Sequence, residues 1–364
     1  MAERVAAVVV GAGPAGLAVS ACLRGADVEH ALLEREPAVA TSWRRHYDRL
    51  HLHTDRRRSI LPGASFPPGT PRYPSRDQVI AYLERYAAEH AAPPRLGEEV
   101  RSARREADAW AVETTRGAFR ARHLVVATGV NGEPIEPSWP GLEGFPGEVL
   151  HSARYRNGAA WRDRDVLVVG LGNSGGEIAI DLHEHGARPA LSVRGPVSVI
   201  PRDVLGVPVL ALAVPLARLP PRVADLLARP LIRLTLGDPA RAGLARPSTG
   251  PMEQIARRAR IPLIDVGTLG LLRTGAVRLF PGLERFDGAE ARFVDGRAAR
   301  FDAVVLATGY RPRLDFLAGA PSPGASEARA QRLHYCGFDV VATGMLRQIA
   351  IEARAIARRV TADR

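Results

Sequence analysis

Lysine is absent from this chain, because every one of its 50 basic residues is arginine. A mechanism that needs a Schiff base or a lysine nucleophile is therefore excluded. Cysteine is almost absent too, since only Cys22 and Cys336 occur, far apart in the sequence. They supply neither a disulfide framework nor a C-x-x-C redox pair nor a zinc-binding spacing. This scarcity fits a reducing cytoplasm.

Long apolar runs are also missing. The longest, around residues 207–217, is broken by Pro208 and Pro215 and followed by Arg218. It falls short of the roughly 20 apolar residues that a membrane span needs. The N-terminal run lacks the charged segment and cleavage site of a signal peptide. We expect no membrane span and a cytoplasmic location.

The charge balance is strongly basic, with a formal net charge of +11. The arginines are scattered, and no nucleic-acid-binding motif accompanies them, so we expect a solvated surface and phosphate-bearing cofactors, with no nucleic-acid partner. The chain has 364 residues, of which 46% are hydrophobic and 24% charged. This length and composition are typical of a globular protein with two domains.

A glycine pattern follows the first apolar run. Residues 5–10 predict a buried strand, and G-A-G-P-A-G at residues 11–16 leads into a helix. Such glycines permit a tight turn and a close approach of the backbone to a pyrophosphate, which the helix N-terminus then faces. A second strand ends in Glu34, whose carboxylate suits ribose hydroxyls and would repel a 2′-phosphate. These residues predict a site for FAD or NAD.

The same pattern occurs a second time. A strand at residues 166–169 precedes the glycines of a second G-x-G-x-x-G, Gly170, Gly172 and Gly175. After the next strand the residue is Arg194, with Arg202 close behind, and arginine can pair with a 2′-phosphate. Each unit also ends in Ala-Thr-Gly, at residues 127–129 and 307–309. The repeat predicts two dinucleotides, FAD in the first unit and NADPH in the second.

Between the two units lies the spacing F-x-G-x-x-x-H-x-x-x-Y, formed by Phe145, Gly147, His151 and Tyr155. It resembles the fingerprint of the class B flavin-containing monooxygenases, and the resemblance extends over residues 5–360. The stretches R-P-S-T-G-P at 246–251 and P-L-I-D-V-G at 262–267 resemble plant-type indole-3-pyruvate monooxygenases.

The resemblance implies an α/β fold with two Rossmann-like dinucleotide-binding domains, the NADPH domain being inserted in the FAD domain. We expect the FAD domain at residues 1–155 and 311–364. The NADPH domain is expected at residues 156–310, with a helical insert around 203–260.

The resemblance also implies an activity. NADPH reduces FAD, dioxygen adds at flavin C4a, and the resulting (hydro)peroxyflavin transfers one oxygen atom to a small-molecule substrate. Three outcomes stay open: oxidative decarboxylation of an aryl-pyruvate, N- or S-oxygenation, and Baeyer–Villiger insertion. The last is disfavoured, because Baeyer–Villiger enzymes usually end the fingerprint in Trp followed by Pro or Asp, whereas here it ends in Tyr155 and Arg156.

Other readings stay open as well. The Arg-rich composition equally suits an enzyme that tailors a natural product. An NADPH oxidase or diaphorase without oxygen transfer needs no additional residue, whereas a flavin disulfide reductase needs a cysteine pair that this chain lacks. A homo-oligomer is neither indicated nor excluded.

The resemblance places the catalytic positions at His53, His151 and Tyr155. His53 occupies the place where several relatives have an asparagine that helps to hold the flavin adduct. A structural or surface role stays open for His51 and His53, and they lack the constellation of carboxylates or cysteines that a metal site would require. The expected cofactor-binding residues come from both units: Gly11, Gly13, Pro14, Ala15, Gly16, Glu34, Arg35, Trp43, His51, Leu52, Thr128, Gly170, Gly172, Asn173, Ser174, Gly175, Arg194, Arg202, Thr308, Gly309, Tyr310, Gly344 and Leu346.

Overall fold

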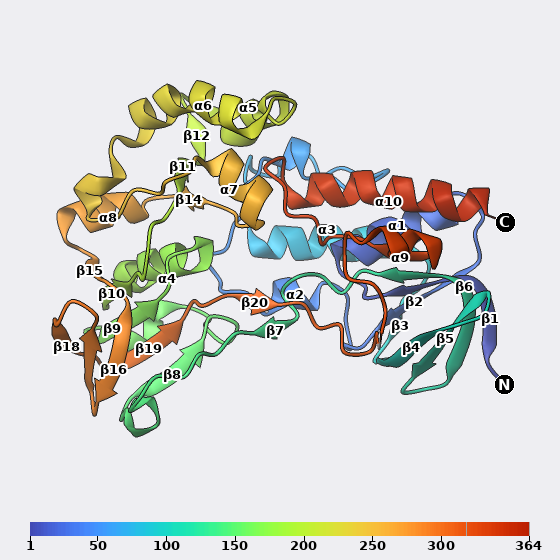
Figure 1. Cartoon of the computed structure of the whole chain (residues 1–364), viewed down its shortest axis with the longest axis horizontal. Helices are drawn as coiled ribbons and strands as arrows, with labels where there is room; N and C mark the ends of the chain where they lie inside the picture. The colour runs from blue at the N-terminus through green and yellow to red at the C-terminus, as the bar shows by residue number, and fades with distance from the viewer. Residues whose placement is uncertain (318, 364) are drawn as a thin grey trace.

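The computed structural model describes residues 1–317 and 319–363. Two sheets lie side by side, each covered by helices, and a helical insert extends from the second (Figure 1). The N- and C-termini both lie beside the first sheet (Figure 1).

The first sheet has the strand order β3-β2-β1-β6-β5-β4, with β21 also paired to β6. Strand β1 is parallel to both β2 and β6, and its apolar residues are buried as predicted. The antiparallel strands β4, β5 and β6 extend the sheet on one side. The strands are β1 (Glu3–Val10), β2 (His30–Glu34), β3 (Arg95–Leu96), β4 (Val100–Glu106), β5 (Ala109–Thr114), β6 (Ala118–Val126) and β21 (Leu333–Tyr335).

Three long helices pack with this sheet: α1 (Pro14–Arg24), α3 (Arg76–Glu89) and α10 (Met345–Ala362). Ser75 caps α3, because its hydroxyl accepts a hydrogen bond from the backbone N–H of Gln78, and the Gln78 side chain accepts one from the backbone N–H of Ser75. Helix α10 places the apolar stripe that its sequence predicts, from Leu346 to Val360, in the same core as α1.

The second sheet is entirely parallel, with the order β15-β10-β9-β19-β8. Its helix α4 (Asn173–Glu184) begins at the second glycine turn, directly after Gly172. The strands are β8 (Glu148–His151), β9 (Asp165–Val169), β10 (Arg188–Ser192), β15 (Arg278–Phe280) and β19 (Ala303–Leu306). An antiparallel meander adjoins them: β16 (Leu283–Asp287), β17 (Glu290–Phe293) and β18 (Ala298–Arg300).

In sequence, the residues that form the second sheet are inserted between two segments that form the first sheet. The first sheet uses residues 3–126 and 333–335, whereas the second uses residues 148–306. The chain runs between them through β7 (Glu133–Pro134) and β20 (Tyr310–Arg311), which form a two-stranded ladder. The inserted arrangement is therefore confirmed, and the domain limits at residues 155 and 310 stay a prediction.

The helical insert lies at the edge of the second sheet (Figure 1). It exposes several leucines, among them Leu226, Leu227 and Leu234. No helix in the described part of the chain is long and apolar enough to cross a membrane. Its elements are β11 (Val199–Pro201), β12 (Asp203–Val204), β13 (Val207–Pro208), α5 (Val209–Leu216), α6 (Pro221–Leu236), η4 (Pro239–Ala242), α7 (Pro251–Arg258), β14 (Leu263–Asp265) and α8 (Thr268–Thr274).

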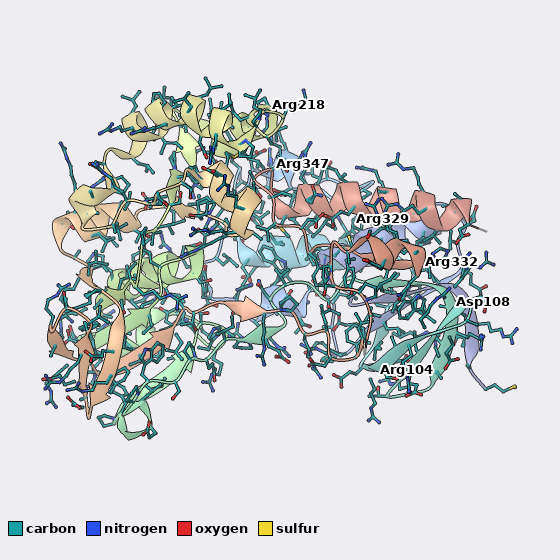
Figure 2. All side chains as sticks on the ribbon, in the orientation of Figure 1. Arg104, Asp108, Arg218, Arg329, Arg332 and Arg347 are labelled. Carbon is teal, nitrogen blue, oxygen red and sulfur yellow. The ribbon has the colours of Figure 1, made fainter. Side chains whose placement is uncertain are left out.

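Short elements complete the chain: α2 (Thr41–Arg44), η1 (Arg56–Arg58), η2 (Leu142–Gly144), η3 (Gly158–Trp161) and α9 (Ser326–Ala330). Arginine side chains project from both halves of the molecule, Arg218 beside the insert and Arg104 on the first sheet among them (Figure 2). The excess positive charge is thus distributed widely over the surface.

Two histidines face each other inside the first sheet. His123 of β6 and His334 of β21 are 2% and 6% exposed, and their Nδ1 and Nε2 atoms lie 3.2 Å apart. Burial lowers the pKa of each to about 4, to which nearby arginines contribute. Asp363 lies 3.4 Å from His123 and acts in the opposite direction. The folded chain therefore holds both rings neutral.

This pair predicts a loss of stability in mild acid. In the unfolded chain a histidine binds a proton near pH 6.5, whereas these two bind one only near pH 4 in the folded chain. The free energy of unfolding should therefore fall between pH 7 and pH 5, by on the order of 2 kcal/mol for each ring. Urea unfolding at several pH values measures the slope. In His334→Phe the slope should be smaller, and an unchanged slope would contradict this account.

Candidate active site at two glycine turns

The first glycine turn joins β1 to α1. Gly11 has φ +102°, and a Cβ there would lie 2.8 Å from the carbonyl oxygen of Ala127. A Cβ on Gly16 would lie 1.7 Å from the carbonyl oxygen of Gly11, so only glycine lets α1 pack this close to the turn. Gly13 differs, because a Cβ there would meet nothing within 4 Å. Gly13 is also the N-cap of α1 and brings no side-chain cap. The turn thus presents open space and uncapped backbone N–H groups to a phosphate.

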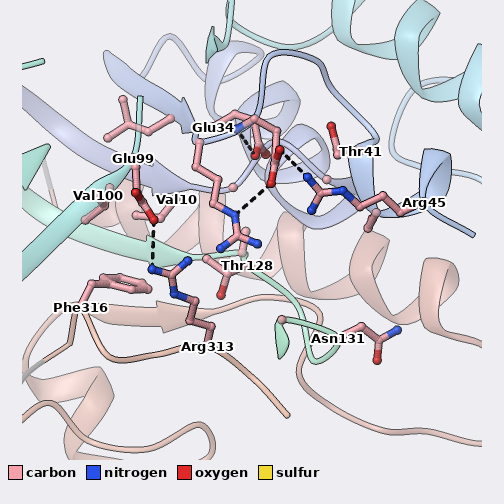
Figure 3. A pocket seen from close by; sticks show the side chains of 18 of the residues that line it. Val10, Glu34, Thr41, Arg45, Glu99, Val100, Thr128, Asn131, Arg313 and Phe316 are labelled. Atoms are coloured by element: carbon pink, nitrogen blue, oxygen red, sulfur yellow. Dashed lines mark hydrogen bonds and ion pairs between the residues drawn. The ribbon is translucent and has the colours of Figure 1, made fainter. Parts of the chain in front are cut away.

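A cavity of about 450 Å³ opens at this turn. Figure 3 shows Val10, Glu34 and Thr128 around it, together with Val100 and Phe316. The hydroxyl oxygen of Thr128 is buried and has no hydrogen-bond partner in the described chain. A buried polar atom of this kind indicates a group that the chain itself does not supply. Of the residues expected to bind FAD, the cavity is lined by Gly11, Gly13, Glu34, Arg35, Thr128 and Tyr310.

Glu34 lies at the end of β2, where the sequence predicts a ribose contact. One carboxylate oxygen accepts a hydrogen bond of 2.7 Å from the backbone of Ala12, and the other accepts one of 3.0 Å from Glu36. Burial raises the pKa of Glu34, although both backbone hydrogen bonds act against this. Each oxygen keeps an unused lone pair beside the cavity, so a ribose hydroxyl can still be accepted.

Charged side chains outside the predicted set also line the cavity. Arg45 pairs with Glu36 at 2.7 Å, and Arg313 pairs with Glu99 at 3.1 Å (Figure 3). Arg35 also reaches Glu36, at 3.4 Å. Sequence reasoning did not select Arg45 or Arg313, because the chain is rich in arginine and nothing in their immediate neighbours distinguishes them.

The second glycine turn repeats the geometry of the first. Gly170 has φ +105°, and a Cβ on Gly175 would lie 2.1 Å from the Gly170 carbonyl oxygen. Gly172 is the N-cap of α4 without a side-chain cap, and a Cβ there would meet nothing within 4 Å. Asn173 is engaged with the chain, because its side-chain oxygen accepts a hydrogen bond of 2.8 Å from Ile264. The open position is therefore Gly172.

The two arginines expected near this turn differ in their surroundings. Arg194 is exposed, and its guanidinium makes no hydrogen bond or ion pair with any described residue. Arg202 is already engaged: its guanidinium lies 4.4 Å from the centre of the Tyr73 ring and 3.4 Å from an oxygen of Asp203. Tyr73 also donates a hydrogen bond of 2.6 Å to Asp203. Arg202 thus joins the insert to the first half, and only Arg194 is available to a phosphate.

His151 of the fingerprint links β8 to the second Ala-Thr-Gly. It is fully buried, its Nδ1 accepts a hydrogen bond of 3.1 Å from Ala153, and its Nε2 donates one of 3.1 Å to the Gly309 carbonyl. These two contacts assign the proton to Nε2. Burial lowers the pKa of the ring. With both nitrogens occupied, His151 holds the turn beside Tyr310, whose ring centre is 5.0 Å away. Thr308 of the same turn donates a hydrogen bond to Ile135.

Tyr155, the last residue of the fingerprint, lies away from the cavity. It is fully buried in the core of the second half, its ring stacks on Trp161, and its hydroxyl donates a hydrogen bond of 2.6 Å to Asp181 of α4. The structure therefore does not bring Tyr155 together with the cavity-lining residues. Its contacts anchor the fingerprint to α4.

The polar segment at residues 41–54 runs between the two halves. Tyr47 is buried in the core of the second half and Leu52 in that of the first, where Trp43 packs beside it. His51 is exposed, with its Nδ1 2.7 Å from the Arg49 carbonyl oxygen. Trp43, His51 and Leu52 thus support the site without lining the cavity.

His53 extends from this segment to α4, where its Nε2 contacts Glu177. Tyr47 also reaches Glu177, and the pKa of Tyr47 is influenced by Ser174, which therefore lies close to it. Gly344 begins α10 beside the segment, because a Cβ there would lie 3.3 Å from Thr54. Glu177 and Tyr47 were not selected from the sequence. The sequence carried one signal for Glu177, because it is an acidic residue among the apolar residues of α4.

Two glycine turns of this kind, each at the carboxyl end of a strand that is parallel to both of its neighbours, define an oxidoreductase of the two-dinucleotide type. The family model described as "Pyridine nucleotide-disulphide oxidoreductase" matches residues 8–203. Indole-3-pyruvate monooxygenase YUCCA1 of Oryza sativa subsp. japonica is 43% identical over 310 residues, which cover 84% of this chain and 76% of that protein. The chain belongs to the indole-3-pyruvate monooxygenase family, and the expected resemblance to flavin monooxygenases is confirmed.

Solved structures agree on the fold. A flavin-containing monooxygenase from Stenotrophomonas maltophilia has a TM-score of 0.75 at 24% identity, over 99% of both chains. A steroid monooxygenase bound to NADP has a TM-score of 0.77 at 20% identity, covering 99% of this chain and 86% of that one. At these identities the likeness shows the shared two-domain architecture.

The glycine turns predict a contrast between two alanine variants. Gly13→Ala should fold with an unchanged melting temperature, because its Cβ meets nothing within 4 Å, yet bind FAD at least tenfold more weakly, because the Cβ occupies the phosphate approach. Gly16→Ala should lower the melting temperature as well, since its Cβ meets a carbonyl oxygen at 1.7 Å. Thermal denaturation and FAD titration of the apoprotein measure both effects. Equal FAD affinity in Gly13→Ala and wild type would show that phosphate does not approach Gly13.

Proposed function

We propose that this chain is an NADPH- and FAD-dependent monooxygenase that decarboxylates an aryl-pyruvate oxidatively. The observation that carries the proposal is the pair of open glycine turns, at Gly13 and Gly172, on two sheets joined by one polar segment that is anchored in both cores. The names of its relatives, which are indole-3-pyruvate monooxygenases, support the substrate class. Dioxygen is the second substrate, and a cytoplasmic location belongs to the same proposal.

FAD fits the first turn. The uncapped N-terminus of α1 would hold its pyrophosphate, Glu34 its ribose, and the unpartnered hydroxyl of Thr128 another polar group of the cofactor. When bound, FAD supplies the redox chemistry: it takes a hydride from NADPH and activates dioxygen for transfer of one oxygen atom to the substrate.

NADPH fits the second turn. The N-terminus of α4 would hold its pyrophosphate, and the unpaired guanidinium of Arg194 its 2′-phosphate. Glu34 ends β2 and Arg194 follows two residues after the end of β10, so a different charge lies beside each turn, and this difference would separate the nucleotide preferences of the two turns. His151 would keep the turn at Gly309 in place beside both sites.

The cysteines argue against disulfide reduction, the activity that the name of the matching family model suggests. Burial raises the pKa of Cys22, and it raises the pKa of Cys336 well above the ordinary thiol value. A protonated, buried thiol is a poor nucleophile. Both cysteines pack in or against the core of the first half, and neither lines the cavity at the first turn.

Product analysis tests the proposal. The purified protein, supplied with FAD, NADPH, dioxygen and indole-3-pyruvate, should release one carbon dioxide and one indole-3-acetate for each NADPH oxidised, with water taking the second oxygen atom. Thioethers, amines and cyclic ketones are the comparison substrates. Their preferential oxygenation would overturn the substrate class, and hydrogen peroxide in place of any oxygenated product would make the protein an oxidase. A protein that cannot bind FAD would contradict the whole proposal.

Preference for NADPH should depend on Arg194. Arg194→Ala should raise the KM for NADPH by about 10- to 100-fold and leave the KM for NADH nearly unchanged, because only NADPH offers a 2′-phosphate. Gly172→Ala is the matched control, since its Cβ meets nothing within 4 Å of the chain but fills the approach of the pyrophosphate that both nucleotides share. Gly172→Ala should raise the KM for NADPH and the KM for NADH. Steady-state kinetics that give Arg194→Ala the same rise for both nucleotides would remove Arg194 from the phosphate site.

A further inference from the structure

A buried carboxylate lies between the two glycine turns. Glu177, in the second turn of α4, is 4% exposed. The same oxygen, Oε1, contacts His53 Nε2 and accepts a hydrogen bond of 3.4 Å from the Tyr47 hydroxyl. Both partners come from the segment at residues 41–54. The contacts therefore connect the helix of the second turn to the segment that borders the first half.

Glu177 determines which atom of His53 is available. An ionised carboxylate can only accept hydrogen bonds, so His53 Nε2 must donate to it. In the neutral ring Nδ1 is then unprotonated and can accept a hydrogen bond. This Nδ1 is buried and has no partner in the described chain. The side chain of His53 as a whole is 14% exposed. A buried nitrogen without a partner is costly, which indicates that it pairs with a group the chain does not supply.

The position of His53 in the fold indicates which bound molecule can supply the missing hydrogen-bond partner of Nδ1. Thr54, the neighbour of His53 in the chain, lies beside the start of α10, because a Cβ on Gly344 would lie 3.3 Å from the Thr54 side chain. On the other side of His53 is α4, whose N-terminus forms the second turn. A hydrogen-bonding atom at this place lies between the helix that begins the NADPH site and a helix of the FAD-binding half.

We propose that Glu177 is a positioning residue, which holds His53 so that Nδ1 hydrogen-bonds the ring system of bound FAD. The carboxylate of Glu177 would keep the ring proton on Nε2, so that Nδ1 stays available to accept a hydrogen bond from bound FAD. Tyr47 supports the carboxylate from a second direction. Burial raises the pKa of Tyr47 well above its ordinary value, as does Glu177, so its hydroxyl stays protonated and continues to donate. Because the role concerns bound FAD, it rests on the proposed function.

Nitrogen resonances of ¹⁵N-labelled histidine provide a test that does not depend on activity. His53→Asn identifies the His53 signals by their loss. In the wild type, Nε2 should appear protonated and Nδ1 bare, and FAD should shift Nδ1. In Glu177→Gln the ring should lose this fixed tautomer, because an amide can donate as well as accept. His53 signals that are identical in Glu177→Gln and the wild type, or that respond to NADP⁺ but not to FAD, would overturn the proposal.

Asp181→Asn is the matched control. Asp181 is also a buried carboxylate of α4 and accepts a hydrogen bond from an aromatic residue, but its partner is Tyr155. Its loss should lower the melting temperature, as the loss of a buried hydrogen-bonded carboxylate does, and leave the His53 tautomer as in the wild type. A His53 signal that changes equally in Asp181→Asn would show that Glu177 acts only through the stability of α4.

Anaerobic reduction of the flavin by NADPH gives a second readout. Glu177→Gln and His53→Gln should each slow reduction by about 10- to 100-fold with little change in FAD affinity or in the KM for NADPH. The double variant should be no slower than the slower single variant, since both remove one unit. If the rate losses of the two single variants added up in the double variant, His53 and Glu177 would act independently, and the proposal would be contradicted. Failure of the wild type to bind FAD or to oxidise NADPH would instead contradict the proposed function, so the two failures are distinguishable.

Discussion

The contact of a helix with the carbonyl oxygen of its own glycine turn is the constraint on which the rest of this structure depends. Gly16 meets the Gly11 carbonyl, and Gly175 meets the Gly170 carbonyl, at distances that leave no room for a Cβ. This contact seats each helix against its strand, so that uncapped backbone N–H groups gather at the carboxyl end of the sheet. Both proposed phosphate sites depend on the two helices that start at those places, and the side chains around them would adjust the charge.

The two halves are joined through polar contacts as well as apolar packing. Tyr47 is buried in one core and Leu52 in the other, so the segment between them has a fixed register. Buried hydrogen bonds are costly when unsatisfied, and they therefore specify one arrangement of the halves more sharply than apolar contact alone would. The contact of His53 with the buried carboxylate of Glu177 is of this kind, and the partly buried hydrogen bond of Tyr73 to Asp203 adds a second polar link. Specificity of orientation matters here, because a hydride must pass between cofactors held by different halves.

The fold could be predicted from the sequence because its signals are local. A buried strand, a glycine turn and a helix follow one another within about 20 residues. The second occurrence of this pattern predicts the second sheet. The partners of individual side chains were not predictable in this way. Arg202 pairs with Tyr73, and Tyr155 with Asp181, through contacts that exist only once distant segments are packed. Glu177 was missed for the same reason, whereas Arg194 could be selected because its position is defined by the end of a strand.

The return of the chain to the first sheet has a consequence for biosynthesis. Strand β21 pairs with β6, and α10 packs beside α1, although more than 200 residues separate these partners. The second sheet is continuous in sequence and can form while the C-terminal residues are still within the ribosome. The first sheet has to wait for β21 and α10, which are made after the whole of the second sheet. The half that is begun first can therefore be completed, and its FAD site closed, only after the inserted half has been synthesised.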